Sequence, residues 1–222
     1  MATEFSVFDI IGPRMTGPSS SHTAGACRIG NMARRIAGQP VRHAHFTLYG
    51  SFAQTGRGHG TDKALVAGVL NMPQDDARIP EALILAEEAG MQVDFTLCNE
   101  ESPHGPNTVC IRLTGINGEE TEVLGCSIGG GNILIVEINA LEVEISGEYP
   151  TLIIQYRDVP GVVSVVTHVL AQHHINIAFM RVFRHGRGED AYMTIETDQE
   201  ISTKVRDLLV GLSDEITTAF TV

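Results

Sequence analysis

The C-terminal third of the chain, residues 150–222, carries the pattern that most limits what this sequence can fold into. Strand patterns of period two alternate there with two helical stripes of period 3.6. The order is strand, helix, strand, strand, helix, strand, which is typical of the ferredoxin-like βαββαβ arrangement, with two helices on one face of an antiparallel sheet. The predicted strands are 152–158, 175–184, 191–197 and 216–222, and the predicted helices begin at Pro160 and after Ser202.

The residues before this unit indicate a separate region of mixed helices and strands. Turn residues at 147–150 interrupt a run of strands, as is common at a domain boundary. We therefore predict an α+β protein with two domains, residues 1–148 and 149–222. Helices are expected at 26–38, 63–71 and 79–90, and strands at 41–50, 91–97, 107–114, 120–125, 133–139 and 141–146.

The overall composition argues against several classes of function. The chain has 222 residues, with 15 Lys and Arg against 27 Asp and Glu, and its formal net charge of -12 repels a nucleic-acid backbone. No apolar run reaches membrane-spanning length, and residues 1–8 lack the basic start and apolar centre of a secretory signal. We expect a cytoplasmic protein that binds neither nucleic acid nor membrane.

Metal-binding side chains are scattered along the chain. Its cysteines are not arranged in the short C-x-x-C spacings that ligate zinc or an iron–sulfur cluster, so free thiols are expected. His43 and His45 share one strand face, but neither a carboxylate nor a cysteine cluster near them completes a metal site. No metal site is therefore expected in this chain. The four cysteines are Cys27, Cys98, Cys110 and Cys126.

Residues 12–25 have the composition of a binding loop. Two Gly-Pro pairs disfavour regular structure, and the hydroxyl groups and one imidazole of this stretch exceed what a solvent-facing loop needs. Because a helix is expected directly afterwards, the loop would present free N–H groups that suit a carboxylate or phosphate. An elaborate helix cap is the alternative interpretation. A serine hydrolase is disfavoured because the serines and His22 are neighbours in sequence, and such neighbours are seldom aligned as nucleophile and base. The polar residues are Ser19, Ser20, Ser21, His22 and Thr23.

A second glycine-rich loop is expected at residues 51–62. Its three glycines permit close approach of the backbone to a ligand, and His59 and Asp62 are titratable. Because the next helix is expected to start at Lys63, His59 would lie at a helix N-terminus.

Two further irregular segments, 102–107 and 127–132, could reach the same ligand pocket as these two loops.

Three motifs that occur together and in order give a family resemblance. They are 8–13, the serine-rich run 17–25, and the stretch 49–63 that contains Gly-His-Gly-Thr-Asp-Lys. With them, the chain resembles the beta subunits of bacterial iron–sulfur L-serine dehydratases over essentially its whole length. The resemblance implies an N-terminal domain of the allosteric-substrate-binding type and a C-terminal ACT domain. It also implies conversion of L-serine to pyruvate and ammonia with a [4Fe–4S] cluster, whose cysteines the alpha subunit supplies.

The same resemblance implies roles for individual residues. His22 and His59 become the acid/base candidates, without a ranking between them, and Tyr49 joins them as a catalytic candidate. The third motif departs from the family pattern, because Gly105 separates His104 from Pro106 and Asn107. The residues implied to bind substrate are Ser19, Ser20, Ser21, Thr23, Ser51, Thr61, Asp62, His104 and Asn107.

The C-terminal unit resembles an ACT amino-acid-sensing domain, and three of its residues match positions that hold an amino acid between paired copies. These are Asp158, Gly161 and Asn176. Free amide groups at the helix start would take the carboxylate, and Asp158 or Asn176 the ammonium group. Alternatively, the domain serves only for self-association. We therefore expect an alpha subunit, a second copy of this chain and L-serine as partners. The competing hypothesis is a non-catalytic amino-acid-sensing module.

Overall fold

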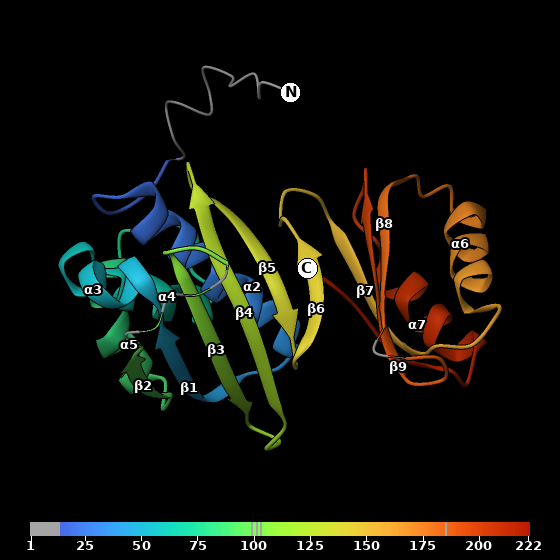
Figure 1. Ribbon diagram of the computed structural model, residues 1–222, viewed down its shortest axis with the longest axis horizontal. Helices are drawn as coiled ribbons and strands as arrows, with labels where there is room; N and C mark the ends of the chain where they lie inside the picture. The colour runs from blue at the N-terminus through green and yellow to red at the C-terminus, as the bar shows by residue number, and fades with distance from the viewer. Residues whose placement is uncertain (1–13, 99, 101, 103, 185) are drawn as a thin grey trace. The chain divides into compact units, whose positions relative to one another are not determined.

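The computed structural model describes residues 14–98, 100, 102, 104–184 and 186–222. The chain divides into two compact units, the first ending at Asn139 and the second comprising Ala140–Val222 (Figure 1). This division falls earlier than the limit of 148/149 expected from the turn residues. Strand β6 (Leu141–Ile145) belongs to the second unit, where it contacts β8 and β9. The domain limits 1–148 and 149–222 stay a prediction. None of the described helices is long and apolar enough to cross a membrane.

The first unit is an α+β arrangement in which β1 lies between β2 and β3 in the order β2-β1-β3-β4-β5. β1 and β2 run parallel and the other neighbours antiparallel. The elements are η1 Ser20–Gly25, α2 Ala26–Ala37, β1 Val41–Leu48, α3 Gly50–His59, α4 Thr61–Val69, η2 Ile79–Glu81, α5 Ala82–Glu88, β2 Gln92–Leu97, β3 Thr108–Gly115, β4 Glu120–Gly129 and β5 Asn132–Ile138.

One face of this sheet is buried by helix α2. The alternation predicted for β1 is confirmed, since Ala44, Phe46 and Leu48 are buried and the residues between them are partly exposed. Ile29 of α2 is fully buried and lies against Gly125 of β4, where a larger residue would leave it no room. The apolar stripe of α2 and the alternating residues of the strands therefore form one core.

Helices α2 and α4 touch backbone to backbone through two glycines. A Cβ atom at Gly30 would collide with the carbonyl oxygen of Leu65, and one at Gly68 with the carbonyl oxygen of Cys27. Because backbone atoms cannot swing aside as a side-chain end can, only glycine permits this approach. The contact fixes the position of α2 and hence of the turn that precedes it.

The glycine-rich stretch 51–62, predicted as a loop, is helical. Helix α3 covers Gly50–His59 and ends where Gly60 adopts φ 71° before α4 begins. Its first N–H groups are satisfied from outside the helix, because the Pro106 carbonyl accepts from Ser51 (2.6 Å) and Phe52 (3.3 Å). Gly56 faces the buried Thr61 at close range. Tertiary contacts therefore outweigh the low helix propensity of the glycines.

Two other irregular segments are also more regular than expected. Residues 20–25 form a π-helical turn that continues directly into α2, although the Gly-Pro pairs predicted an open loop. In the segment 127–132, β4 extends to Gly129 and β5 begins at Asn132, so only Gly130 and Gly131 form the turn. A strand paired on both edges gains hydrogen bonds that the local sequence does not reveal.

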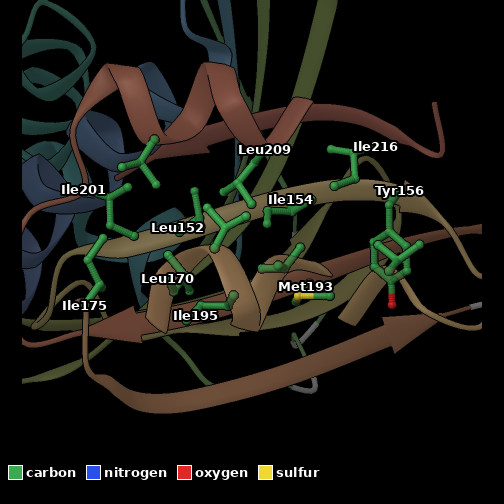
Figure 2. Packing of buried hydrophobic residues seen from close by; sticks show 14 of the residues in the cluster. Leu152, Ile154, Tyr156, Leu170, Ile175, Met193, Ile195, Ile201, Leu209 and Ile216 are labelled. Carbon is green, nitrogen blue, oxygen red and sulfur yellow. The ribbon is translucent and has the colours of Figure 1, made fainter. Parts of the chain in front are cut away.

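The second unit confirms the ferredoxin-like prediction. Its sheet has the order β10-β7-β9-β8 with antiparallel neighbours, and α6 and α7 cover one face (Figure 1). Figure 2 shows side chains from both helices meeting those of the sheet, with Leu170 and Leu209 opposite Leu152 and Ile154. The elements that follow β6 are β7 Thr151–Arg157, α6 Val162–Gln172, β8 Ile177–Arg184, β9 Asp190–Thr197, α7 Thr203–Leu212 and β10 Ile216–Thr221.

Candidate active site

His22 lies at the centre of a polar cluster formed by the serine-rich turn and helix α3. Its Nε2 atom is 3.1 Å from the hydroxyl oxygen of Ser51 and 3.1 Å from that of Thr55. The two hydroxyl oxygens are themselves 3.4 Å apart. One ring nitrogen therefore faces two groups that can each donate or accept a hydrogen bond, an arrangement that can transfer a proton.

The turn before α2 fixes the backbone of His22. The Ser19 hydroxyl accepts a hydrogen bond from the His22 N–H (3.1 Å), and the Ser19 carbonyl accepts one from the Thr23 N–H (2.9 Å). Ser19 therefore acts as the helix cap that the alternative interpretation expected. Gly25 packs so closely on Ser127 of β4 that a Cβ atom would collide with the serine hydroxyl. The cap and the close packing together hold the imidazole toward α3.

His59 stands beside His22, with ring centroids 4.8 Å apart and ring planes at 39°. Its Nδ1 atom lies 3.1 Å from the Thr55 carbonyl oxygen, and its own carbonyl accepts a hydrogen bond from the Thr23 hydroxyl (3.3 Å). His59 directly precedes Gly60, the N-cap of α4, as the prediction of a helix N-terminus requires, but it is also the last residue of α3, which was not expected. Ser51, Thr55 and His59 follow at intervals of four residues, so they share one face of the helix.

The surroundings of His22 favour the neutral imidazole. Burial, and secondarily the nearby His59 imidazole, lowers the pKa of His22, while hydrogen bonding at Ser51 partly opposes the shift. The ring also meets buried Phe52 edge to face at a centroid distance of 5.2 Å. A neutral imidazole at physiological pH can accept a proton from a bound molecule.

Residues 104–108 are distant from α3 in sequence but form hydrogen bonds near its first residue. The Thr108 carbonyl accepts the Tyr49 N–H (3.0 Å), and the Thr108 hydroxyl donates to the Gly105 carbonyl (2.7 Å). His104 faces another strand, with Nε2 3.8 Å from a Glu137 carboxylate oxygen. Asn107 is anchored through its carbonyl, which accepts the Ser127 N–H (2.9 Å).

Three side-chain oxygens near these segments are buried without a hydrogen-bond partner among the described residues. They belong to Thr61, Asn107 and Ser127. Since a buried hydroxyl or amide oxygen normally finds a partner, these atoms have capacity to bind a further polar group. Thr61 and Asn107 were expected to bind substrate from the family motifs. Ser127 was expected only as part of the segment 127–132 that could reach the same pocket, without a role of its own.

The remaining site candidates have varied environments. The side chains of Ser20 and Ser21 make no hydrogen bond with the described part of the chain, although both lie in the turn beside His22. Burial raises the pKa of the Tyr49 hydroxyl, which keeps it protonated and able to donate. Asp62 accepts the Lys63 N–H at 2.9 Å and lines a cavity. Within the described part of the chain, neither Tyr49 nor Asp62 forms a hydrogen bond or ring contact with His22.

The residues that the structure describes do not fit an iron–sulfur cluster. No group of three or more His, Cys, Asp or Glu within the described ranges is placed to hold a metal ion. Burial raises the pKa of Cys27 to about 12 and of Cys110 to about 11, and it also raises that of Cys126. Because thiolates are the form that ligates iron, these buried thiols are poor ligands.

The candidates in the second unit take part in separate interactions. The Asp158 carboxylate accepts a hydrogen bond from the Arg184 guanidinium (3.0 Å), and the Asn176 amide donates to Asp198 (2.7 Å). Gly161 precedes α6 with φ 104°, a conformation that favours glycine. The structure does not bring Asp158 and Asn176 into contact, so their shared role in binding an amino acid stays a prediction.

Comparison with known proteins gives the family. Residues 6–137 match the family model of the serine dehydratase beta chain. The chain belongs to the serine dehydratase beta chain family. Residues 150–220 match the ACT domain model, as the resemblance of the C-terminal unit predicted.

Members of this family are similar to the chain over nearly its whole length. An L-serine dehydratase beta chain of Peptoniphilus asaccharolyticus is 41% identical and covers 98% of this chain, which in turn covers 97% of that protein. A probable L-serine dehydratase beta chain of Bacillus subtilis is 44% identical, with 95% of each covered. A D-3-phosphoglycerate dehydrogenase of the same species is 29% identical over 85% of this chain and 36% of that protein.

Proposed function

We propose that this chain is the beta subunit of an L-serine dehydratase and supplies proton-transfer and substrate-binding groups to its active site. The observation that carries the proposal is the cluster in which His22 faces Ser51, Thr55 and His59. The similarity of almost the entire chain to two beta chains of this enzyme supports the assignment of the reaction.

The reaction requires a positioned base because the Cα–H of serine is a weak acid and hydroxide is a poor leaving group. In the proposed reaction, a neutral imidazole removes the Cα proton, the Cβ–O bond breaks, and the leaving hydroxide takes the proton from the imidazolium to depart as water. The resulting 2-aminoacrylate tautomerises to an imine, which takes up water to give pyruvate and ammonia. His22 and His59 are the two candidates for the base, and their contact allows the proton to pass between the rings.

Polar groups around the histidines would hold the substrate. We propose that the hydroxyl groups of the serine turn and the buried oxygens of Thr61 and Asn107 receive the carboxylate and ammonium groups of serine, directly or through ordered water. Tyr49, Asp62 and His104 are included from the family motifs. The full substrate-binding set is Ser19, Ser20, Ser21, Thr23, Ser51, Thr61, Asp62, His104 and Asn107.

A partner chain must complete this site. Because the thiols here are scattered, and those of Cys27 and Cys126 are buried, we propose that an alpha subunit ligates the [4Fe–4S] cluster expected from the family resemblance. The free thiols also suit a reducing compartment such as the cytoplasm. We further propose that the ACT domain mediates self-association, with Asp158, Gly161 and Asn176 as its candidate regulatory residues.

The test is anaerobic reconstitution of this chain with the alpha subunit, followed by measurement of pyruvate formation from L-serine. The variants His22→Gln and His59→Gln are each expected to lower kcat, and loss of the base should cost about 10²–10⁴-fold. His43→Gln is the matched control, since His43 lies on β1 and pairs with Asp94. If both variants assemble and turn over serine at the wild-type rate, the assignment of the base is wrong.

A non-catalytic amino-acid-sensing module is the second candidate function, and the ACT domain match is the observation that favours it. The two hypotheses differ in one measurement. A sensor would bind an amino acid and change the activity of a separate enzyme, while complexes that lack this chain would still form pyruvate. The dehydratase proposal requires that neither chain alone forms pyruvate.

A further inference from the structure

Behind helix α3 the first unit contains a cavity of about 200 Å³ that shares Asp62 with the proposed substrate-binding set but includes neither His22 nor His59. Its inner wall consists of Leu48 and Phe52, which are shielded from solvent, and of the partly buried Phe95. Leu97, 49% exposed, stands among the lining residues, and so do the charged side chains of Arg57 and Asp62. An apolar interior with a few polar groups is the usual composition of a small-molecule site.

The cavity and the His22 cluster lie on different faces of α3. Ala53 and Arg57 line the cavity, whereas Ser51 and Thr55 face His22. Since each residue turns the helix by about 100°, positions two apart point about 200° away from each other. The cavity therefore lies on another face of α3 than the His22 cluster, and Asp62 is the residue of the substrate-binding set that lines it.

The cavity also lies where ligands commonly bind in sheets of this kind. β1 and β2 are parallel, and their last paired residues, Leu48 and Leu97, both line it. Phe95 is held in place by stacking on the buried Phe46, with ring centroids 5.0 Å apart. The carboxyl ends of parallel strands are the general location of ligand crevices in open α/β sheets.

The charged side chains at the cavity indicate which charged groups a ligand would carry. The Arg57 guanidinium is exposed and forms no ion pair within the described part of the chain, so its planar fork can take a carboxylate. The Asp62 carboxylate uses Oδ1 for the Lys63 N–H, and Oδ2 can accept from an ammonium group. A cavity of about 150 Å³ accepts a benzene ring, so this one has room for a branched or aromatic side chain.

We propose that this cavity binds a free α-amino acid with an apolar side chain, with its carboxylate on Arg57 and its ammonium group on Asp62. The apolar side chain lies against Leu48, Phe52 and Phe95. Serine, the proposed substrate, has no group to fill this interior. Phe52 also contacts the His22 ring, at a centroid distance of 5.2 Å, so ligand binding is sensed at the proton-transfer cluster.

The test is calorimetric titration of the full-length chain with L-leucine at neutral pH. Saturable one-site binding is expected. Isoamylamine lacks the carboxylate and 4-methylpentanoate lacks the ammonium group, and each is expected to bind at least about 10-fold more weakly than leucine, because each loses one charge-assisted contact. No saturable leucine binding would overturn the proposal. Equal binding of either analogue would overturn the zwitterion assignment.

Two variants test whether leucine binds in this cavity. Arg57→Gln should weaken leucine binding about 10-fold and leave isoamylamine binding unchanged, because only leucine has a carboxylate. Arg42→Gln, at an exposed arginine of β1, is the matched control and should bind leucine as the wild type does. Ala53→Leu should fill the cavity and abolish binding while circular dichroism stays native. If Arg57→Gln and Ala53→Leu both bind leucine normally, the ligand does not occupy this cavity.

These measurements need neither the alpha subunit nor turnover, so the cavity proposal and the dehydratase proposal can fail separately. As a readout inside the molecule, the ring signals of His22 in ¹H–¹³C NMR spectra should shift when leucine binds. The signals of His168, an exposed residue of α6, should not shift. A leucine complex that leaves the His22 signals unchanged would contradict the link through Phe52.

Discussion

At His22, burial and a neighbouring imidazole act in the same direction, and both lower the pKa of the ring. The unfolded chain therefore binds more protons than the folded chain between the folded pKa and the unfolded value of about 6.5. In that interval the free energy of unfolding rises with pH. Acid therefore lowers the free energy of unfolding through His22, the residue that the proposed reaction needs as a neutral base.

The first prediction concerns this pH dependence. As pH falls from about 6.5 toward the folded pKa of His22, the wild-type chain should lose stability that His22→Gln retains, because glutamine does not titrate. Urea midpoints measured at a series of pH values test this. His168→Gln, which removes an exposed histidine of α6, shows whether loss of any imidazole gives the same change. Parallel curves for wild type and His22→Gln would contradict the prediction.

Single residues of the candidate site could be predicted only where a motif contains the contacting side chain. The sequence singled out His22, Ser51 and His59, which the structure brings together. It missed Thr55, because the stretch 51–62 was expected to be a loop and four-residue spacing has meaning only in a helix. The family match tests none of these roles, so the assignment of acid, base and substrate-binding residues stays a prediction.

At the level of elements, the crossing of α2 and α4 depends on two glycines that no local pattern explains. Helical glycines usually lower stability, but Gly30 and Gly68 are placed where any Cβ atom would meet the backbone of the other helix. Their benefit comes from a contact between segments that are distant in sequence. Strand and helix periodicity predicted both helices, but it could not predict how closely they approach.

The second prediction compares two glycine-to-alanine changes in the first unit. Gly68→Ala should lower the free energy of unfolding by about 1–3 kcal/mol, because the added methyl group forces α2 and α4 apart. Gly58→Ala, in α3, should be neutral or stabilising by up to about 1 kcal/mol, because nothing lies within 4 Å of its Cβ position. Urea denaturation followed by circular dichroism measures both. Equal losses in the two variants would mean that helix contact does not decide the effect.

The elements of the second unit were predicted more accurately than those of the first. Its valine-rich helix and apolar strands have clear periodicity, and they form the buried core drawn in Figure 2. In the first unit, α3 and the extension of β4 to Gly129 depend on partners elsewhere in the chain, such as the Pro106 carbonyl for α3. Local sequence cannot specify such partners, so glycine-rich segments were expected to be irregular.

For the whole molecule, the ACT domain presents an edge strand with exposed apolar side chains. β8 pairs with β9 and ends the order of its sheet, and Phe179 on it is 57% exposed. Phe179 also lies near the exposed Tyr149, with ring centroids 6.5 Å apart. Edge strands with apolar side chains favour pairing with another copy. This surface supports the proposed self-association.

The third prediction tests that surface. Phe179→Asp should raise the dissociation constant for self-association about 30-fold, the effect of losing about 2 kcal/mol at an interface hot spot. Sedimentation velocity over a range of concentrations measures it. Ile116→Asp, which changes a somewhat more exposed apolar residue after β3 in the first unit, is the control and should leave the constant unchanged. If Phe179→Asp associates like the wild type, β8 is not the contact surface.

The serine turn continues directly into α2, and α2 packs closely on α4. This arrangement affects when the site around His22 forms during synthesis. Thr23 and His59 are only 36 residues apart, so the contacts of the two histidines arise within one short stretch of nascent chain. Domains begin to form from the N-terminal side as they leave the ribosome. The strands β3, β4 and β5 that cover α2 are translated later. The side of α2 that packs on these strands therefore stays uncovered in the interval.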